Sequence, residues 1–180
     1  MRKCRFLLPD AVYHVTMRTN RKEMVLDSFG VKELYLSVLK AAKARYSMQI
    51  LNFCIMGNHV HLIIKPGHTE DLSTIMQWIN SVFAIRFNKL MGLCGHVWGE
   101  RFFSVILHSL GDFLRAFRYV DENPVAAHLS IAPTTWLFGG LHHAKAGRYD
   151  VLGLPDALCQ MLFPNRKPFL LEYRDASGTC

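Results

Sequence analysis

The sequence predicts an α+β fold in which helices cover an antiparallel sheet. Short runs rich in β-branched and aromatic residues alternate with longer stretches whose apolar residues recur at helical spacing. In chain order these segments read β-α-β-β-α-β-α. This order contains the split βαβ units of ferredoxin-like sheets, in which two helices lie on one face.

The predicted strands are short and bounded by turn residues. The first covers residues 11–17 and the last covers 102–108. The middle two, 49–56 and 59–65, are separated only by Gly57-Asn58. Because so short a break leaves no room for a crossover, these two strands are expected to form an antiparallel hairpin.

The predicted helices are recognised by apolar stripes and by a start signal. The first begins at Val31, and the second carries one apolar stripe over residues 72–90. Ser109 and Asp112 resemble a capping box that opens the third helix. This helix is expected to stop before Pro124 because proline disfavours the helical conformation of the preceding residue.

One domain is predicted over residues 1–136. A chain of 180 residues, 51% of them hydrophobic, is long enough for a core and short enough for one domain. Beyond Trp136, glycine and proline residues interrupt any long element. Residues 137–180 are therefore expected to be a C-terminal extension, either packed on the domain or partly mobile.

A cytoplasmic location is expected. No apolar run approaches the roughly 18 residues that span a membrane, and the apolar stretch near the N-terminus is too short for a signal peptide. The 5 cysteines are scattered and contain no C-x-x-C pair. This usage argues against a disulfide framework and against a cysteine-based zinc site.

Positive charge is concentrated in the first quarter of the chain. The formal net charge is +7, and residues 1–45 contain ten Lys and Arg against four Asp and Glu. A basic surface attracts polyanions and speeds their encounter. Composition alone leaves open both nucleic-acid binding and a solvated basic surface without a partner.

The motif His59-Val60-His61 lies on the predicted strand 59–65. Because side chains alternate along a strand, both imidazoles share one face while Val60 lies on the other. Neutral imidazole is a ligand for divalent transition metals, so the pair indicates part of a metal site. The alternative is two half-buried histidines that form ordinary hydrogen bonds.

Tyr119 lies on the polar face of the predicted third helix, near Arg115 and Arg118. Asn123 follows it by four residues and is therefore its neighbour on the helix surface. A phenol, a pair of imidazoles and an amide oxygen are groups that transesterification at a phosphate requires. Taken singly, each residue favours a simpler interpretation: Tyr119 a ring resting on the sheet with its hydroxyl in water, and Asn123 a helix cap before Pro124.

Four segments, in order, resemble sequence blocks of the single-tyrosine HUH transposases. Residues 56–62 (Met-Gly-Asn-His-Val-His-Leu) resemble the M-P-N-H-V-H-L block of this family. Residues 119–127 resemble the Y-I-x-x-N-P-V-R-A block of its REP-associated tyrosine transposase branch. Residues 98–102 resemble a W-x-x-R-F block, and residues 13–18 a Y-H-V-T-x-R strand. The match runs from about residue 13 to 136, and its specificity comes from the four blocks together.

This resemblance implies that Tyr119 is a nucleophile on a helix beside the His-x-His strand. His59, His61 and Asn123 would be ligands of Mg²⁺ or Mn²⁺. The family cuts single-stranded DNA near hairpins, leaving a 5′-phosphotyrosine and a free 3′-hydroxyl that later rejoins the strand. The basic residues expected to contact DNA are Arg18, Arg21, Lys22, Arg101, Arg115 and Arg118.

Two positions and one segment depart from the family pattern. Gly57 replaces a proline in the hairpin, and Ala126 stands where an arginine that contacts phosphate is common. Residues 136–138 (Trp-Leu-Phe) differ from the W-S-S stretch of the family, so no DNA contact is carried over to them. None of these changes removes a catalytic group.

Rival functions remain open at this stage. A relaxase or replication-initiator nickase shares the HUH motif, although the Asn-Pro-Val block after Tyr119 favours a transposase. A non-catalytic, ferredoxin-like nucleic-acid-binding module would make the histidine pair and Tyr119 coincidental. A metal phosphodiesterase would cut without a covalent adduct. The family contains dimers that exchange the tyrosine helix as well as monomeric members, so the sequence is compatible with a monomer or a homodimer.

Overall fold

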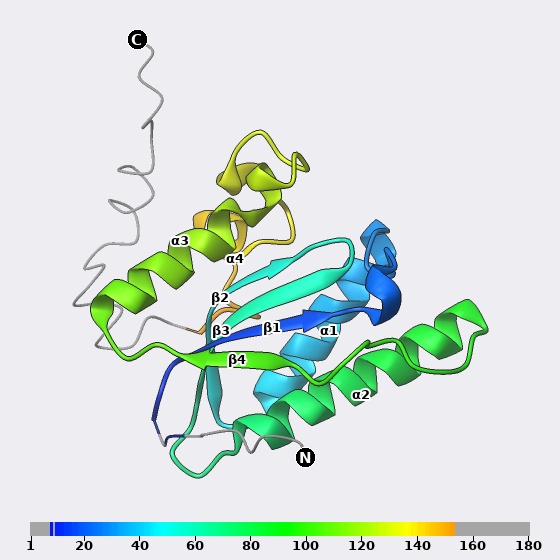
Figure 1. Cartoon of the computed structure of the whole chain (residues 1–180), viewed down its shortest axis with the longest axis horizontal. Helices are drawn as coiled ribbons and strands as arrows, with labels where there is room; N and C mark the ends of the chain where they lie inside the picture. The colour runs from blue at the N-terminus through cyan, green and yellow to red at the C-terminus, as the bar shows by residue number, and fades with distance from the viewer. Residues whose placement is uncertain (1–7, 9, 154–180) are drawn as a thin grey trace.

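A four-stranded antiparallel sheet forms the centre of the computed structural model, which describes residues 8 and 10–153 (Figure 1). The strands are β1 (Tyr13–Arg18), β2 (Met48–Ile55), β3 (His59–Pro66) and β4 (Phe103–Ile106). Their spatial order is β2-β3-β1-β4, so β1 lies between β3 and β4. The predicted α+β class, the four strands and the antiparallel pairing are confirmed.

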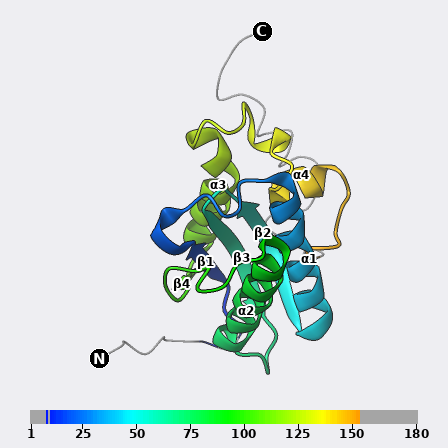
Figure 2. The ribbon, with the colours of Figure 1, turned by 90° about the vertical axis from the view of Figure 1, so that its right-hand side faces the viewer.

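The helices lie on both faces of this sheet (Figure 2). They are α1 (Phe29–Arg45), α2 (Leu72–Met91), α3 (Leu110–Ala126) and α4 (Gly140–Lys145), with 3₁₀ turns η1 (Asn20–Lys22) and η2 (Pro133–Thr135). Helices α1 and α2 cover one face, as expected for split βαβ units. Helix α3 packs on the opposite face, over β2 and β3.

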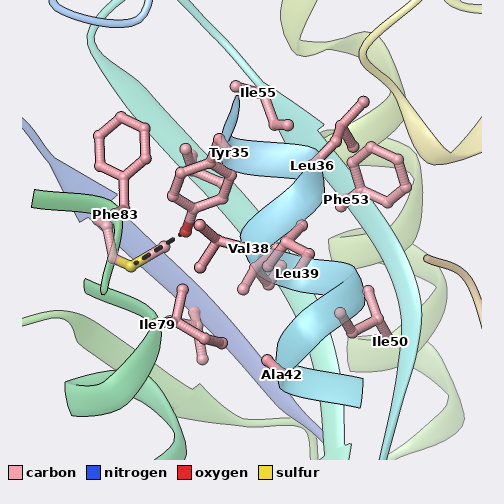
Figure 3. Close-up of a cluster of buried hydrophobic side chains, with 14 of the residues drawn as sticks. Tyr35, Leu36, Val38, Leu39, Ala42, Ile50, Phe53, Ile55, Ile79 and Phe83 are labelled. Atoms are coloured by element: carbon pink, nitrogen blue, oxygen red, sulfur yellow. Dashed lines mark hydrogen bonds between the residues drawn. The ribbon is translucent and has the colours of Figure 1, made fainter. Parts of the chain in front are cut away.

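The main core fills the space between the sheet and the helices α1 and α2 (Figure 3). Tyr35 of α1 lies at its centre, with its ring 5.0 Å from that of Phe83 on α2. The Tyr35 hydroxyl donates a hydrogen bond to the sulfur of Met17 on β1, at 3.6 Å. Side chains at alternate positions of β1 and β3, such as Val15 and Leu62, enter this core and leave the residues between them for the opposite face.

The hairpin between β2 and β3 forms where the sequence predicts it. The peptide N–H of Met56 donates to the carbonyl of His59 at 2.9 Å and closes the turn around Gly57. A Cβ at Gly57 would lie 2.3 Å from Cε of Met24. The proline of the family pattern would therefore meet Met24 here, which gives a packing reason for glycine.

Helix α3 begins as expected but ends later. The side chain of Ser109 accepts from the peptide N–H of Asp112 at 3.0 Å, and the Asp112 carboxylate accepts from the N–H of Ser109 at 3.2 Å. The predicted end before Pro124 is wrong, because the helix continues to Ala126. Proline lacks a peptide N–H, but its fixed φ is compatible with a helix, so the helical conformation continues through Pro124. Asn123 therefore lies inside the helix, one turn after Tyr119.

Residues 136–153 cover the outer edge of β2. The peptide N–H of Ile55 donates to the carbonyl of Phe138 at 3.0 Å, and that of Gly153 donates to Ile50 at 2.8 Å. The buried side chains of Phe138 and Leu152 belong to the main core. This segment protects an edge that would otherwise expose unpaired peptide groups. The domain boundary at residue 136 stays a prediction, and residues 154–180 of the extension lie outside the described residues.

The structure tests the expectations on cysteines and on membrane spans only for the residues that it describes. Cys54 and Cys94 are free thiols, whereas Cys4, Cys159 and Cys180 lie outside the described residues. Among the helices that the structure describes, none is both long and apolar enough to cross a membrane.

We predict that Gly140→Ala destabilises the fold. A Cβ at this position would lie 2.2 Å from Oδ1 of Asn52 and 3.0 Å from the peptide nitrogen of Phe53. Overpacking of this kind costs about 1–3 kcal/mol, and urea unfolding should show a loss of this size. Gly30→Ala is the control, since no atom lies within 4 Å of its added Cβ; stability should rise by up to about 1 kcal/mol. Equal stability of Gly140→Ala and wild type would contradict this packing.

Candidate active site

The two histidines of the motif lie on the face of the sheet that carries α3. His61 pairs with Thr16 of β1, and His59 pairs with Arg18. Since opposite residues of an antiparallel pair point to the same face, these four side chains lie together. Val60, between the histidines, is buried in the main core on the other face. The alternation expected from the sequence is confirmed.

His61 is the most buried member of this group, with 3% of its surface exposed. Its Nδ1 lies 3.1 Å from Nε2 of His14 and 3.1 Å from Oγ1 of Thr16. Its Nε2 is buried and has no hydrogen-bond partner. Burial, followed by the charges of His59, His14 and Arg18, lowers the pKa of His61 to about 3. The imidazole is therefore neutral at physiological pH.

His59 is half-buried and contacts α3. Its Nδ1 lies 2.7 Å from Oδ1 of Asn58, and its side chain is hydrogen-bonded to that of Asn123. The Asn123 amide nitrogen donates to the carbonyl of Tyr119 at 3.2 Å, which leaves the amide oxygen for His59. Burial and the nearby Arg18 lower the pKa of His59, against the smaller effect of Asn123.

Tyr119 lies beside the buried histidines at the edge of α3. Its ring centroid is 5.3 Å from that of His61 and 5.8 Å from that of His14. The side chain is 51% exposed, so a large substrate can reach it. The structure thus brings Tyr119, His59, His61 and Asn123 together from two elements of one chain.

Buried contacts hold α3 in this position. Phe113, Phe117 and Val120 pack on the sheet in a second apolar cluster. Within this interface the Asn52 amide of β2 donates to the Asp121 carboxylate at 2.8 Å. In the low-dielectric interior a hydrogen bond is electrostatically stronger than in water. Asp121 is two residues after Tyr119, so this bond fixes the helix close to the site.

The donor atoms fit a divalent metal ion. Metal ligands must be unprotonated, and the lowered pKa values of both histidines meet this condition. His61 also offers a buried Nε2 without a partner. In the described part of the chain, no three His, Cys, Asp or Glu side chains cluster to hold a metal. The metal ligands would therefore be two imidazoles and the Asn123 amide oxygen, all of them neutral. Mg²⁺ favours carboxylates or substrate phosphates as ligands.

The structure separates the predicted DNA-binding residues into two groups. Four of them line one groove of about 410 Å³ next to the histidines, namely Arg18, Arg21, Lys22 and Arg101. Arg115 instead forms an ion pair with Asp112 in the first turn of α3, at 2.6 Å. Arg118 is exposed on α3. The groove is thus the main concentration of cations beside the candidate site.

His14 and Thr16 received no role from the sequence, although both lie in the segment that resembles the family's first strand. Alternation along residues 11–17 places them on one face. Their contact with His61 depends on β1 lying next to β3, which strand patterning does not reveal. Phe103, which lines the same groove, also received no role from the sequence, because its position depends on the pairing of β4 with β1.

Comparison with known proteins finds one family model and two solved structures that are similar to this chain. The family model described as "Transposase IS200 like" matches residues 8–123. A solved REP-associated tyrosine transposase bound to a REP hairpin is similar, with a TM-score of 0.70 and 19% identity, covering 87% of this chain and 92% of that one. A putative transposase from Deinococcus radiodurans R1 gives a TM-score of 0.49 and 16% identity, covering 68% and 97%. No curated protein matches the chain.

The extent of the family match decides the assignment. It includes the strand of His59 and His61, and it ends at Asn123, so it spans the elements that form the site. The similarity to the solved REP-associated transposase, at 19% identity, extends to the overall fold. The chain therefore belongs to the IS200-like family of Y1 transposases, which are enzymes that cleave and join DNA.

Proposed function

We propose that this chain cuts and rejoins single-stranded DNA through a covalent 5′-phosphotyrosine at Tyr119. The observation that carries the proposal is the meeting of Tyr119 with His59, His61 and Asn123 at the edge of α3. In this proposal Tyr119 is the nucleophile and the other three residues hold Mg²⁺ or Mn²⁺. A non-catalytic nucleic-acid-binding module would have no need for this combination.

The chemistry is an exchange of phosphate esters. The phenol oxygen of Tyr119 attacks the phosphorus, and the bond from phosphorus to the preceding 3′-oxygen breaks. The phenol proton passes to water, and the departing 3′-oxygen takes a proton from water, so the products are a phosphotyrosine and a free 3′-hydroxyl. Attack by a 3′-hydroxyl on the phosphotyrosine later joins the strands and restores the tyrosine. When bound, the metal ion would polarise a phosphate oxygen and stabilise the developing negative charge.

The position of α3 brings all four proposed site residues together within one chain. The helix packs on its own sheet through a buried apolar cluster and through the Asn52–Asp121 bond. We therefore propose that a monomer is sufficient for cleavage. In the alternative, a homodimer would exchange α3 between subunits, and each exchange would have to break these contacts and form them again.

The proposed substrate is a single-stranded end next to a hairpin. Support comes from the solved relative, which is a REP-associated transposase bound to a REP hairpin, and from the cationic groove, whose lining includes Thr16, the neighbour of His61. Cleavage of such DNA, with capture of the covalent complex under denaturing conditions, tests the function as a whole. A relaxase or replication-initiator nickase would also form an adduct, so this experiment separates such enzymes, the transposase included, from a non-catalytic binding module.

We predict that Tyr119→Phe abolishes cleavage and the covalent adduct while leaving DNA binding intact. The change removes one oxygen from a half-exposed ring, so stability should change by about 1 kcal/mol or less. Denaturing gels with labelled hairpin DNA would detect the adduct, and fluorescence anisotropy would report binding. Tyr149→Phe is the matched control and should cleave like wild type.

His61→Ala completes this test. It should also abolish cleavage, but through the loss of metal binding rather than of the nucleophile. Cleavage by Tyr119→Phe at the wild-type rate would show that the enzyme is a metal phosphodiesterase or uses another nucleophile. If wild type forms no adduct with any single-stranded hairpin, the binding-module alternative is favoured.

We predict that replacing Arg18, Arg21 and Lys22 by Ala weakens single-strand binding and flattens its salt dependence. Each phosphate contact contributes about 0.7 to the slope of log K against log salt for single strands, so the slope should fall by up to about 2. Titrations at several salt concentrations measure it. The control replaces three exposed cations of α2 and α4, namely Arg86, Lys89 and Lys145. An unchanged slope in the first variant would rule out this groove as the DNA track.

We predict that His14 and Thr16 fix the tautomer of His61. Both contact its Nδ1, and a buried N–H without an acceptor is costly. The proton should therefore lie on Nδ1, which leaves Nε2 free for a metal. Long-range ¹⁵N NMR of the metal-free protein measures the tautomer. Thr16→Val combined with His14→Leu should give a mixture and weaken Mn²⁺ binding about 10- to 100-fold; a wild-type Nε2-protonated ring would contradict this assignment.

A further inference from the structure

One row of paired residues crosses the sheet from the covered face beneath α3 to an open surface. Cys54 of β2 pairs with His61, His61 with Thr16, and Thr16 with Phe103 of β4. Because paired residues of antiparallel strands share a face, these side chains lie on one line. Cys54 is buried within the α3 interface, whereas Phe103 is 66% exposed. The candidate active site lies between them.

Phe103 is an aromatic side chain on the open half of the sheet. The preceding residue, Phe102, is buried in the main core on the other face. Val105 follows on the same face as Phe103 and is also exposed. A single exposed apolar residue needs no explanation by itself. The surroundings of Phe103 are what make its exposure informative.

Phe103 lines the cationic groove described above. The same groove is bounded by Thr16, Arg18, Arg21, Lys22 and Arg101, with Glu100 as the acidic residue. Four cations against one anion favour a polyanion. Proteins that bind single-stranded nucleic acids combine such a basic groove with aromatic rings on which bases stack. The composition of this groove matches both parts of that design.

The backbone of η1 supports a binding role for the groove. Arg21 and Lys22 are consecutive non-glycine residues with φ of 50° and 59°. This left-handed conformation is unfavourable for side chains with a Cβ and is often retained at functional sites. It is held by the Asn58 amide, which donates to the carbonyl of Lys22 at 3.0 Å. This hydrogen bond thus connects the turn that carries Arg21 and Lys22 to Asn58, the residue before His59.

The groove also continues away from the active site. Asn20, Gly99, Glu100 and Arg101 line both this groove and a larger cavity of about 680 Å³. The second cavity is bounded by amide side chains of α2, including Gln77 and Asn80. A single strand that passes Phe103 therefore has an open path along the molecule.

We propose that Phe103 is a stacking platform for a base of the single-stranded substrate, next to the phosphate that Tyr119 attacks. The proposal rests on the proposed function and assigns a position to its substrate strand. Two strand spacings separate His61 from Phe103, a span of roughly 10 Å, which nucleotides adjoining the reacting phosphate can reach. Phosphates on the same segment would lie along Arg18 and Arg101. Because every base has a π-face, the contact adds affinity without selecting sequence.

The test measures binding separately from cleavage. All variants carry Tyr119→Phe to prevent adduct formation, and the ligand is a single-stranded hairpin with 2-aminopurine at successive positions beside the cleavage site. Phe103→Ala should weaken binding about 5- to 150-fold, the equivalent of one lost base stack, and should restore 2-aminopurine emission at one position. Phe103→Trp should retain both affinity and quenching. Phe103→Leu should behave like alanine, because it is apolar but has no aromatic face.

Phe29→Ala is the matched control. Phe29 is 61% exposed, but its ring contacts that of Phe138 and does not line the groove, so its loss should leave binding unchanged. The proposal is overturned if Phe103→Ala binds as tightly as this control, or if leucine replaces phenylalanine without loss. Adduct formation by otherwise wild-type protein is measured in parallel. If the protein with Tyr119 intact forms adducts but Phe103→Ala leaves binding unaltered, only the stacking platform is refuted. If the protein with Tyr119 intact forms no adduct, the proposed function is refuted.

Discussion

The packing of α3 against the sheet is the contact on which the candidate site depends. Two of the four groups, Tyr119 and Asn123, belong to this helix, and the other two belong to β3. Apolar burial attaches the helix to the sheet, but apolar contacts alone permit it to slide or rotate. The buried bond from Asn52 to Asp121 is directional and removes this freedom. It therefore sets where Tyr119 meets the histidines.

The opposite face of the sheet makes this placement possible. Helices α1 and α2 bury the aliphatic residues of β1 and β3, which fixes the register between these strands. A shift by one residue would bring His61 into the apolar core and Val60 to the face that carries α3 and Tyr119. The resulting loss of burial strongly disfavours any such shift. The core on one face thus determines the contacts of His14 and Thr16 with His61 on the other.

Much of this arrangement could be predicted from the sequence, and the exceptions have physical reasons. Strand alternation predicted the common face of His59 and His61, and helical spacing predicted that Asn123 lies beside Tyr119. The predicted end of α3 was wrong because a proline can lie inside a helix when its missing N–H is tolerated. The proposed roles of His14 and Phe103 depend on which strands are neighbours, and local patterning carries no information on that order. The assignment of Tyr119 as nucleophile came from the family resemblance.

The electrostatics of the site link metal binding to DNA binding. The proposed ligands are neutral, so the protein supplies no negative charge to offset a divalent cation. The adjoining groove is rich in cations, which makes the same region unfavourable for a metal ion in isolation. A DNA phosphate reverses both conditions, since it neutralises groove charge and adds an anionic oxygen ligand. Metal and substrate should therefore bind cooperatively, which confines the reactive state of Tyr119 to the complex with DNA.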